Sequence, residues 1–143
     1  MAVYLDTSFL VPLFFRETAS AAVLARARGE SELWISHWTL AEFSAATAFK
    51  LRSGQTDETT ARQATAKLQA ILTGHGLIVA ELRAADFERA AQLCAAHASG
   101  LRTPDALHAA IAARLKLPLL TCDKGLAQGC QYHGIGHEYV GVS

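Results

Sequence analysis

The pattern that decides the fold lies in residues 102–125, RTPDALHAAIAARLKLPLLTCDKG. A hydroxyl residue and a proline, Thr103 and Pro104, mark the start of a helix as capping residue and first helical residue. Apolar residues then recur at helical spacing, and a short apolar run follows at residues 117–121. The stretch therefore predicts a helix over residues 103–115 that leads directly into a buried β-strand.

The same alternation of short β-type runs and longer helical stretches continues along the chain. The runs predicted as strands are residues 3–5, 33–35, 77–79, 117–121 and 139–140. The stretches predicted as helices are residues 8–15, 20–28, 39–52, 57–73, 84–98 and 103–115. Because strands and helices alternate, we expect an α/β fold in which helices cover both faces of a parallel sheet.

The composition is that of one well-packed domain. The chain has 143 residues, of which 51% are hydrophobic and 18% charged, and these values exclude a disordered protein. We therefore predict a single domain over residues 1–143. The 13 basic and 13 acidic residues cancel, so any contact with nucleic acid must be local rather than a property of the overall charge.

Cysteine usage and hydropathy indicate the compartment. Cys94, Cys122 and Cys130 are odd in number and have no CxxC spacing, so neither a disulfide framework nor a zinc site is expected. The N-terminal residues MAVYLDTSFL lack the features of a signal peptide, and no apolar run reaches the roughly 18 residues of a membrane span. We expect a soluble protein of the reducing cytoplasm, with no membrane partner.

Four acidic residues lie where a parallel sheet places its ligand-binding edge. Asp6 ends the first predicted strand, and Asp123 ends the fourth. Glu42 follows the second strand, and Asp105 opens the helix before the fourth. Since the carboxyl ends of parallel strands and the neighbouring helix starts share one edge, we expect the four carboxylates to converge.

Such a cluster calls for a cation. Two bare carboxylates about 4 Å apart repel by roughly 4 kcal/mol at an effective dielectric constant near 20. An all-oxygen donor set favours Mg²⁺ or Mn²⁺ over zinc. We predict Asp6 and Asp105 as direct ligands, with Glu42 and Asp123 ligating a second ion or orienting a water molecule through hydrogen bonds.

Each acid also has a purely structural explanation. Asp6 could cap the helix that follows it, and Asp123 could be an ordinary turn residue. Asp105 could simply complement a helix dipole, and Glu42 could be the partner of Thr39 in a capping box. The apolar neighbours of Asp6, Glu42 and Asp123 favour a site, because surface caps rarely need such surroundings.

Three polar residues near these acids are open to two interpretations. Ser8 could hold a water or a phosphate, or cap a helix, and Thr121 could bind a site carboxylate or be a plain β-forming residue. His108 lies three residues after Asp105, and without an HxxxH or HExxH spacing it is predicted to pack rather than to act in catalysis.

Four segments of the chain resemble, in order, the motifs of PIN domains, and most closely those of VapC-type toxins. They are Leu5-Asp6-Thr7-Ser8, Ala41-Glu42-Phe43, Arg102-Thr103-Pro104-Asp105-Ala106-Leu107-His108-Ala109-Ala110 and Leu120-Thr121-Cys122-Asp123-Lys124. The similarity extends from Val3 to Val142, and all four acids are retained. It implies a three-layer sandwich around a parallel sheet of about five strands, and a ribonuclease that depends on Mg²⁺ or Mn²⁺.

The resemblance also implies partners. It predicts the toxin of a type II toxin–antitoxin system, which cleaves RNA, forms a homodimer and is inhibited by a VapB-like antitoxin that inserts Arg or Lys among the carboxylates. The basic residues expected nearest to the RNA are Arg16, Lys50, Arg52, Arg102 and Lys124. The aromatic residues that suggest a partner interface, although core packing explains at least half of them, are Phe14, Phe15, Trp34, Trp38 and Phe49.

Two alternatives remain at this point. A phosphatase of the haloacid-dehalogenase type also uses an aspartate after its first strand, but it requires a second aspartate where this chain has Ser8. A non-catalytic PIN-like module that only binds RNA or protein would not need to retain four acids.

Overall fold

The computed structural model describes residues 1–141; Val142 and Ser143, which the single-domain prediction includes, lie outside the described residues. The strands are β1 (Ala2–Leu5), β2 (Glu32–Ser36), β3 (Ile78–Ala80), β4 (Leu119–Thr121) and β5 (His137–Tyr139). The helices are α1 (Thr7–Phe14), α2 (Ser20–Ala27), α3 (His37–Arg52), α4 (Glu58–Thr73), α5 (Ala84–Ala95), α6 (Thr103–Leu115) and α7 (Lys124–His133), with a 3₁₀ helix at His97–Ser99.

The five strands form one parallel sheet in the order β3-β2-β1-β4-β5. The chain builds outward from β1 through β2 to β3, and then crosses back to place β4 on the other side of β1. The α/β prediction with a five-stranded parallel sheet is confirmed. The point where the strand order reverses, between β1 and β4, is where open α/β sheets bind their ligands.

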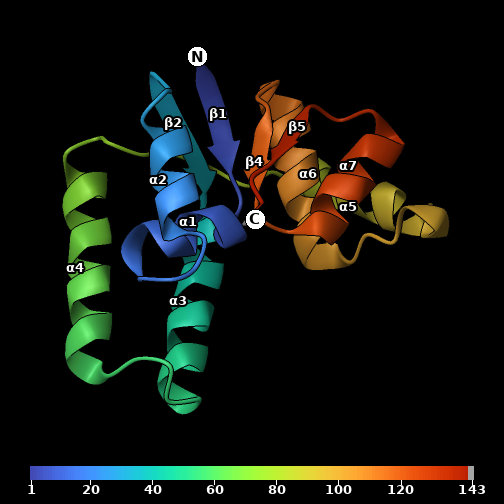
Figure 1. Ribbon diagram of the computed structural model, residues 1–143. Helices are drawn as coiled ribbons and strands as arrows, with labels where there is room; N and C mark the ends of the chain where they lie inside the picture. Colours follow the sequence, from blue (N-terminus) through green and yellow to red (C-terminus); the bar gives the residue numbers. More distant parts are fainter. Residues whose placement is uncertain (142–143) are drawn as a thin grey trace.

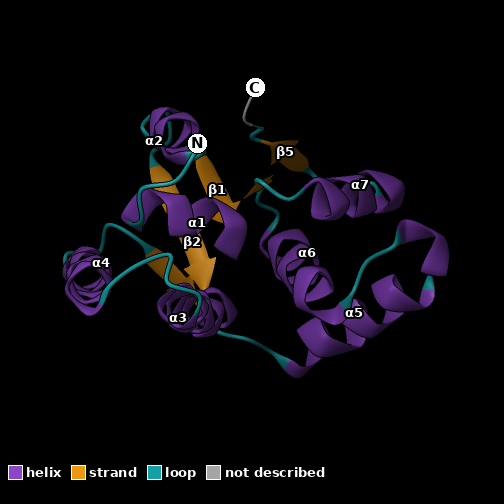
Figure 2. Ribbon diagram, turned by 60° about the horizontal axis from the view of Figure 1, so that its bottom comes forward, coloured by secondary structure: helices purple, strands orange, loops and turns teal. Residues whose placement is uncertain are grey.

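Helices cover both faces of this sheet (Figures 1 and 2). Val3 and Leu5 of β1 face the cluster formed with α1 to α4, whereas Tyr4 faces the cluster formed with α5, α6 and α7. This alternation is the two-residue period of a strand, and because both faces are covered, β1 is apolar on both sides. The result is a three-layer sandwich.

The start of α3 and the capping residue of α6 differ from those predicted, whereas the predicted bounds of α6, residues 103–115, are confirmed. Strand β2 ends at Ser36, and Ser36 caps α3 in a capping box with Thr39. The predicted capping box between Thr39 and Glu42 is therefore wrong, and Glu42 lies in the second turn of α3. Thr103 is the first residue of α6 rather than its cap, because the capping position is Arg102.

Helix α7 was not predicted from the sequence. Its glycines, Gly125 and Gly129, lower intrinsic helix propensity by about 1 kcal/mol each relative to alanine. A Cβ atom at Gly129 would lie 2.4 Å from the side chain of Leu101, so the glycine allows the helix to pack closely. Tertiary packing thus outweighs propensity here.

None of the helices within residues 1–141 combines the length and apolar character needed to span a bilayer.

Candidate active site

Two of the predicted acids lie at the strand-order reversal and cap the helices that start there. Asp6 follows β1, and its Oδ1 accepts a hydrogen bond from the backbone N–H of Phe9 at 3.0 Å. Asp123 follows β4 and accepts one from the N–H of Leu126 at 3.1 Å. The structural explanation holds for both residues, but capping uses only one oxygen of each carboxylate. It does not account for the surroundings of the other oxygens.

The Asp6 carboxylate is buried and held from two sides. The hydroxyl of Ser8 donates to its oxygens at 2.8 and 2.9 Å, and the hydroxyl of Thr121 donates to Oδ2 at 2.7 Å. Thr121 also accepts from the N–H of Asp123 at 2.9 Å, so it connects the two acids. Burial raises the pKa of Asp6, although His108 and these hydrogen bonds oppose the shift.

Ser8 and Thr121 are thus residues that orient Asp6. Ser8 does not cap α1, because Asp6 occupies the capping position; instead Ser8 accepts from the backbone N–H of Cys122 at 2.9 Å. Thr121 has the role of binding a site carboxylate, and it is not merely a β-forming residue.

Asp105 lies in the first turn of α6, and its carboxylate has no hydrogen bond or ion pair within residues 1–141. Burial, followed by the negative charges of Asp123 and Asp6, raises the pKa of Asp105 to about 6. A carboxylate whose pKa is raised by two other carboxylates shares their site. Asp6, Asp105 and Asp123 therefore lie close enough for the charges of Asp6 and Asp123 to act on Asp105.

Glu42 lies at the same site in a different state. The Thr7 hydroxyl donates to its Oε1 at 2.6 Å, and His108 Nε2 lies 2.5 Å from the same oxygen. Burial would raise the pKa of Glu42, but the hydrogen bonds from His108 and Thr7 outweigh it and the pKa is lowered. Glu42 contributes the weakest of the charges that act on Asp105.

His108 has more than the packing role expected from its spacing. Its side chain is buried, and Nδ1 lies 2.8 Å from the hydroxyl of Tyr4 while Nε2 contacts Glu42. The sequence held two signals for this contact. His108 shares a helix face with Asp105, and Tyr4 shares a strand face with Asp6.

The donor set fits a hard divalent cation, because every candidate ligand is a carboxylate oxygen. Within residues 1–141, however, no three His, Cys, Asp or Glu side chains are arranged as a ready-made metal cage. The hydrogen bonds explain part of this, since those to Asp6 and Glu42 fix both carboxylates in place. The like charges around Asp105 are what a cation would neutralise.

The predicted basic residues differ in their surroundings. Lys50 lines a hollow of about 360 Å³ together with Thr7 and Ser8. Lys50 forms an ion pair with Glu17, so its positive charge is partly neutralised. The other four are exposed and form no ion pair within the described part of the chain: Arg16, Arg52, Arg102 and Lys124.

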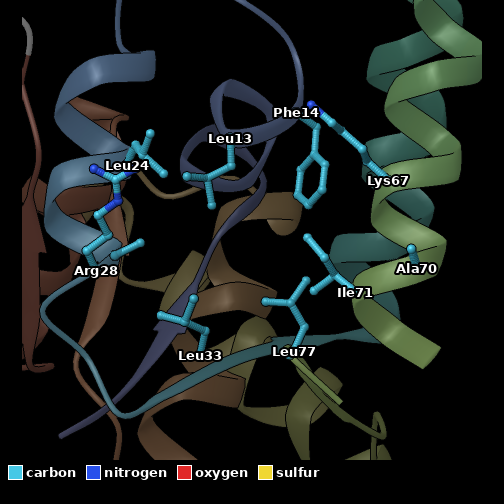
Figure 3. A pocket seen from close by; sticks show the side chains of 11 residues that line it. Leu13, Phe14, Leu24, Arg28, Leu33, Lys67, Ala70, Ile71 and Leu77 are labelled. Atoms are coloured by element: carbon cyan, nitrogen blue, oxygen red, sulfur yellow. The ribbon is translucent and has the colours of Figure 1, made fainter. Parts of the chain in front are cut away.

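A second feature is an apolar groove of about 510 Å³ between α2 and α4, shown in Figure 3. Leu24 of α2 and Ile71 of α4 are exposed on its two sides, and Phe14 lies between them. The only charged residues that line it are Arg28 and Lys67. Of the aromatic residues considered for an interface, Phe14 lines this groove, Phe15 is buried in the core and Phe49 is exposed. The other two, Trp34 and Trp38, are partly buried and pack against the core.

A parallel sheet with acids at the strand-order reversal defines an α/β protein with a carboxylate site. The chain belongs to the PIN domain family, whose model matches residues 3–130. A comparison with curated protein sequences found no match.

Several solved structures share the fold. FitAcB from Neisseria gonorrhoeae has a TM-score of 0.72 at 20% identity, with 96% of each chain covered. VapBC2 from Rickettsia felis, bound to a DNA fragment from its promoter, has a TM-score of 0.69 at 18% identity, covering 97% of this chain and 98% of that one. VapC20 from Mycobacterium tuberculosis, a toxin that cleaves the sarcin–ricin loop, has a TM-score of 0.69 at 17% identity, covering 93% and 95%. The fold is therefore that of VapC-type PIN domains.

Proposed function

We propose that this protein is the toxin of a type II toxin–antitoxin system, a ribonuclease that depends on Mg²⁺ or Mn²⁺. The observation that carries the proposal is the convergence of Asp6, Asp105 and Asp123, with Glu42 beside them, at the strand-order reversal. Family membership and the similarity to VapC structures support it. We extend it to one PIN domain over residues 1–143 that acts in the cytoplasm.

In this proposal the residues divide their work. Asp6, Asp105 and Asp123 hold the cation, which when bound supplies the Lewis acid that polarises the phosphodiester. Glu42 is fixed through Oε1 by Thr7 and His108. Its other oxygen would accept a hydrogen bond from the water that attacks phosphorus. The bond from phosphorus to one ribose oxygen then breaks.

The exposed basic residues would bind the remaining RNA backbone. Phosphate contacts of this kind position a nucleic acid without reading its sequence. Lys50 is the best placed, because it lines the same hollow as Thr7 and Ser8, which flank the carboxylates. Its ion pair with Glu17 would have to exchange for a phosphate contact.

Incubation of the purified protein with total cellular RNA, with and without Mg²⁺ or Mn²⁺, tests the nuclease directly. We expect fragments only when a divalent ion is added, and only a small fraction of the wild-type cleavage from the Asp105→Asn variant. The matched control is Glu88→Gln, an exposed acid on α5, which should cleave like the wild type. Cleavage that persists in a metal chelator, or at the wild-type level in Asp105→Asn, would contradict the proposal.

We further propose a VapB-like antitoxin as partner and the groove between α2 and α4 as one of its contacts. The groove has an apolar lining, and the only charges on it are the cations Arg28 and Lys67. An amphipathic antitoxin helix with acidic residues beside its apolar face would complement it. A basic residue farther along the antitoxin would pair with the carboxylates.

The antitoxin contact can be tested separately from catalysis. Ile71→Asp places a charge in the groove, and we expect it to weaken rescue by the antitoxin while leaving RNA cleavage unchanged. Phe87→Asp is the matched control, because Phe87 is an exposed apolar residue on α5, on the other side of the sheet. Equal loss of rescue in both variants would argue against the groove.

We also propose a homodimer, supported by the exposed aromatic ring of Phe49, which is 56% accessible. Light scattering on the isolated protein measures the oligomeric state. A monomer at all concentrations would contradict this part of the proposal and leave the nuclease untouched.

A further inference from the structure

A continuous series of side-chain hydrogen bonds runs from the start of α3 through β1 and α6 to the active site. The Tyr4 hydroxyl lies 2.9 Å from the Ser36 hydroxyl and 3.3 Å from that of Thr39. It lies 2.8 Å from Nδ1 of His108, whose Nε2 reaches Oε1 of Glu42. All members except Glu42 are buried, so each polar atom needs a partner within the series.

Assigning the proton in each of these hydrogen bonds shows which group donates and which accepts. Glu42 Oε1 accepts a hydrogen bond from the Thr7 hydroxyl, and a carboxylate oxygen only accepts, so Nε2 of His108 carries the proton between His108 and Glu42. In a neutral imidazole Nδ1 then accepts, and the Tyr4 hydroxyl must donate to it. A tyrosine hydroxyl keeps its proton at neutral pH, so it has a proton to donate.

The hydroxyls at the start of α3 complete the count. Thr39 accepts from the backbone N–H of Ser36 at 3.1 Å, and Ser36 accepts from that of Thr39 at 3.4 Å. The two hydroxyls also lie 3.4 Å apart, so one can donate to the other, but at least one proton remains for the oxygen of Tyr4. With Tyr4 donating to His108, the donors point toward Glu42, an arrangement in which successive hydrogen bonds strengthen one another.

The end of the series leaves one oxygen of Glu42 available. Both donors, the Thr7 hydroxyl and His108 Nε2, meet at Oε1. Oε2 has no hydrogen-bond partner among residues 1–141. The Glu42 side chain is 25% accessible, so it is not sealed from solvent.

We propose that His108 is a positioning residue of the active site, held by Tyr4 in the tautomer with the proton on Nε2, and that it fixes Glu42 by Oε1 so that Oε2 faces the attacking water. The proposal rests on the proposed ribonuclease function for its kinetic consequence. The tautomer and its control by Tyr4 do not depend on that function.

The tautomer can be measured by long-range ¹H–¹⁵N NMR of the imidazole in the wild-type protein. We expect a protonated Nε2 and an unprotonated Nδ1 that accepts a hydrogen bond. In Tyr4→Phe the Nδ1 resonance should move, because its donor is lost. A proton on Nδ1, or an unchanged Nδ1 resonance in Tyr4→Phe, would overturn the proposal.

Kinetics test the positioning role. Outer residues that orient active-site groups typically contribute about 10- to 100-fold, and we expect His108→Leu to lower kcat by that factor with KM nearly unchanged. His108→Gln, which retains an N–H donor, should restore most of the activity. Tyr4→Phe should lower kcat by a smaller factor.

Two controls separate positioning from stability. Ser99→Ala removes a buried hydroxyl remote from the site, and Tyr132→Phe removes an exposed one. If Ser99→Ala loses as much activity as His108→Leu at an equal loss of thermal stability, His108 has only a structural role. If the wild type cleaves no RNA, the ribonuclease proposal fails, and the NMR result alone decides the arrangement of Tyr4, His108 and Glu42.

Discussion

The two sides of the active site shift the pKa of a carboxylate in opposite directions. On one side Glu42 receives two hydrogen bonds on a single oxygen, and its pKa is lowered. On the other side Asp105 has no partner among residues 1–141 and faces the charges of Asp123 and Asp6, and its pKa rises to about 6. Both side chains are only partly buried. The difference between the two pKa values therefore comes from their hydrogen-bond partners. Glu42 is held by other residues of the protein, whereas Asp105 is available to bind a cation.

The largest expected effect is on catalysis at the unpartnered side. Asp105→Asn should lower RNA cleavage by about 1,000-fold, equivalent to roughly 4 kcal/mol of transition-state stabilisation, because it removes a proposed metal ligand. Far-UV circular dichroism should remain that of the wild type. Residual activity above a tenth of wild type would place the metal elsewhere.

The next effect concerns metal-dependent stability. At a Mg²⁺ or Mn²⁺ concentration of about 100 times its dissociation constant, the wild type should gain roughly 2.7 kcal/mol in the free energy of unfolding. Asp105→Asn should gain clearly less, since one charge of the site is missing. Chemical denaturation with and without the ion measures both values. Equal gains in the two proteins would show that Asp105 does not bind the metal.

In the metal-free protein, substitutions of Glu42 and Asp105 should change the free energy of unfolding in opposite directions. Loss of the Glu42 charge should destabilise the fold, whereas loss of the Asp105 charge should stabilise it. Glu42→Gln removes the charge that accepts from Thr7 and His108, and we expect it to lower the free energy of unfolding by about 1–2 kcal/mol. Glu88→Gln, on an exposed helix surface, should change it little. A stabilised Glu42→Gln variant would show that the two sides do not differ as described.

The smallest effect is a pH dependence of the metal-free protein. Because folding raises the pKa of Asp105, the native state binds this proton more tightly than the unfolded chain, and its contribution to stability falls as pH rises from about 4 to 6. The Asp105→Asn variant has no carboxylate at this position, so its stability does not fall in this way. Allowing for solvent screening, we expect about 1 kcal/mol, or about 3 °C in Tm, in favour of the variant above pH 6.

Thermal melts at several pH values, in a chelator, measure this difference. It should shrink as the pH falls from 6 and vanish well below pH 4, where Asp105 is protonated in both the folded and the unfolded state, and it should also shrink at high salt. A difference that is constant across this range would come from something other than the charge of Asp105.

Much of the fold follows from local sequence. Strand β1 and helix α6 lie within a residue or so of their predicted positions, because hydrophobic period, proline and apolar run length act between near neighbours. The placement of Asp6 and Asp123 follows from the same signals, since each comes directly after a predicted strand. Parallel strands then bring both to one edge.

What only the tertiary structure decided concerns contacts between distant residues. His108 and Glu42 are 66 positions apart, and no periodicity relates them, so the sequence suggested packing for one and a capping box for the other. Helix α7 was missed because Gly129 opposes a helix locally, yet its missing side chain makes room for Leu101. Sequence patterns report the preferences of neighbouring residues, whereas the partner of each buried polar group depends on which elements pack against it.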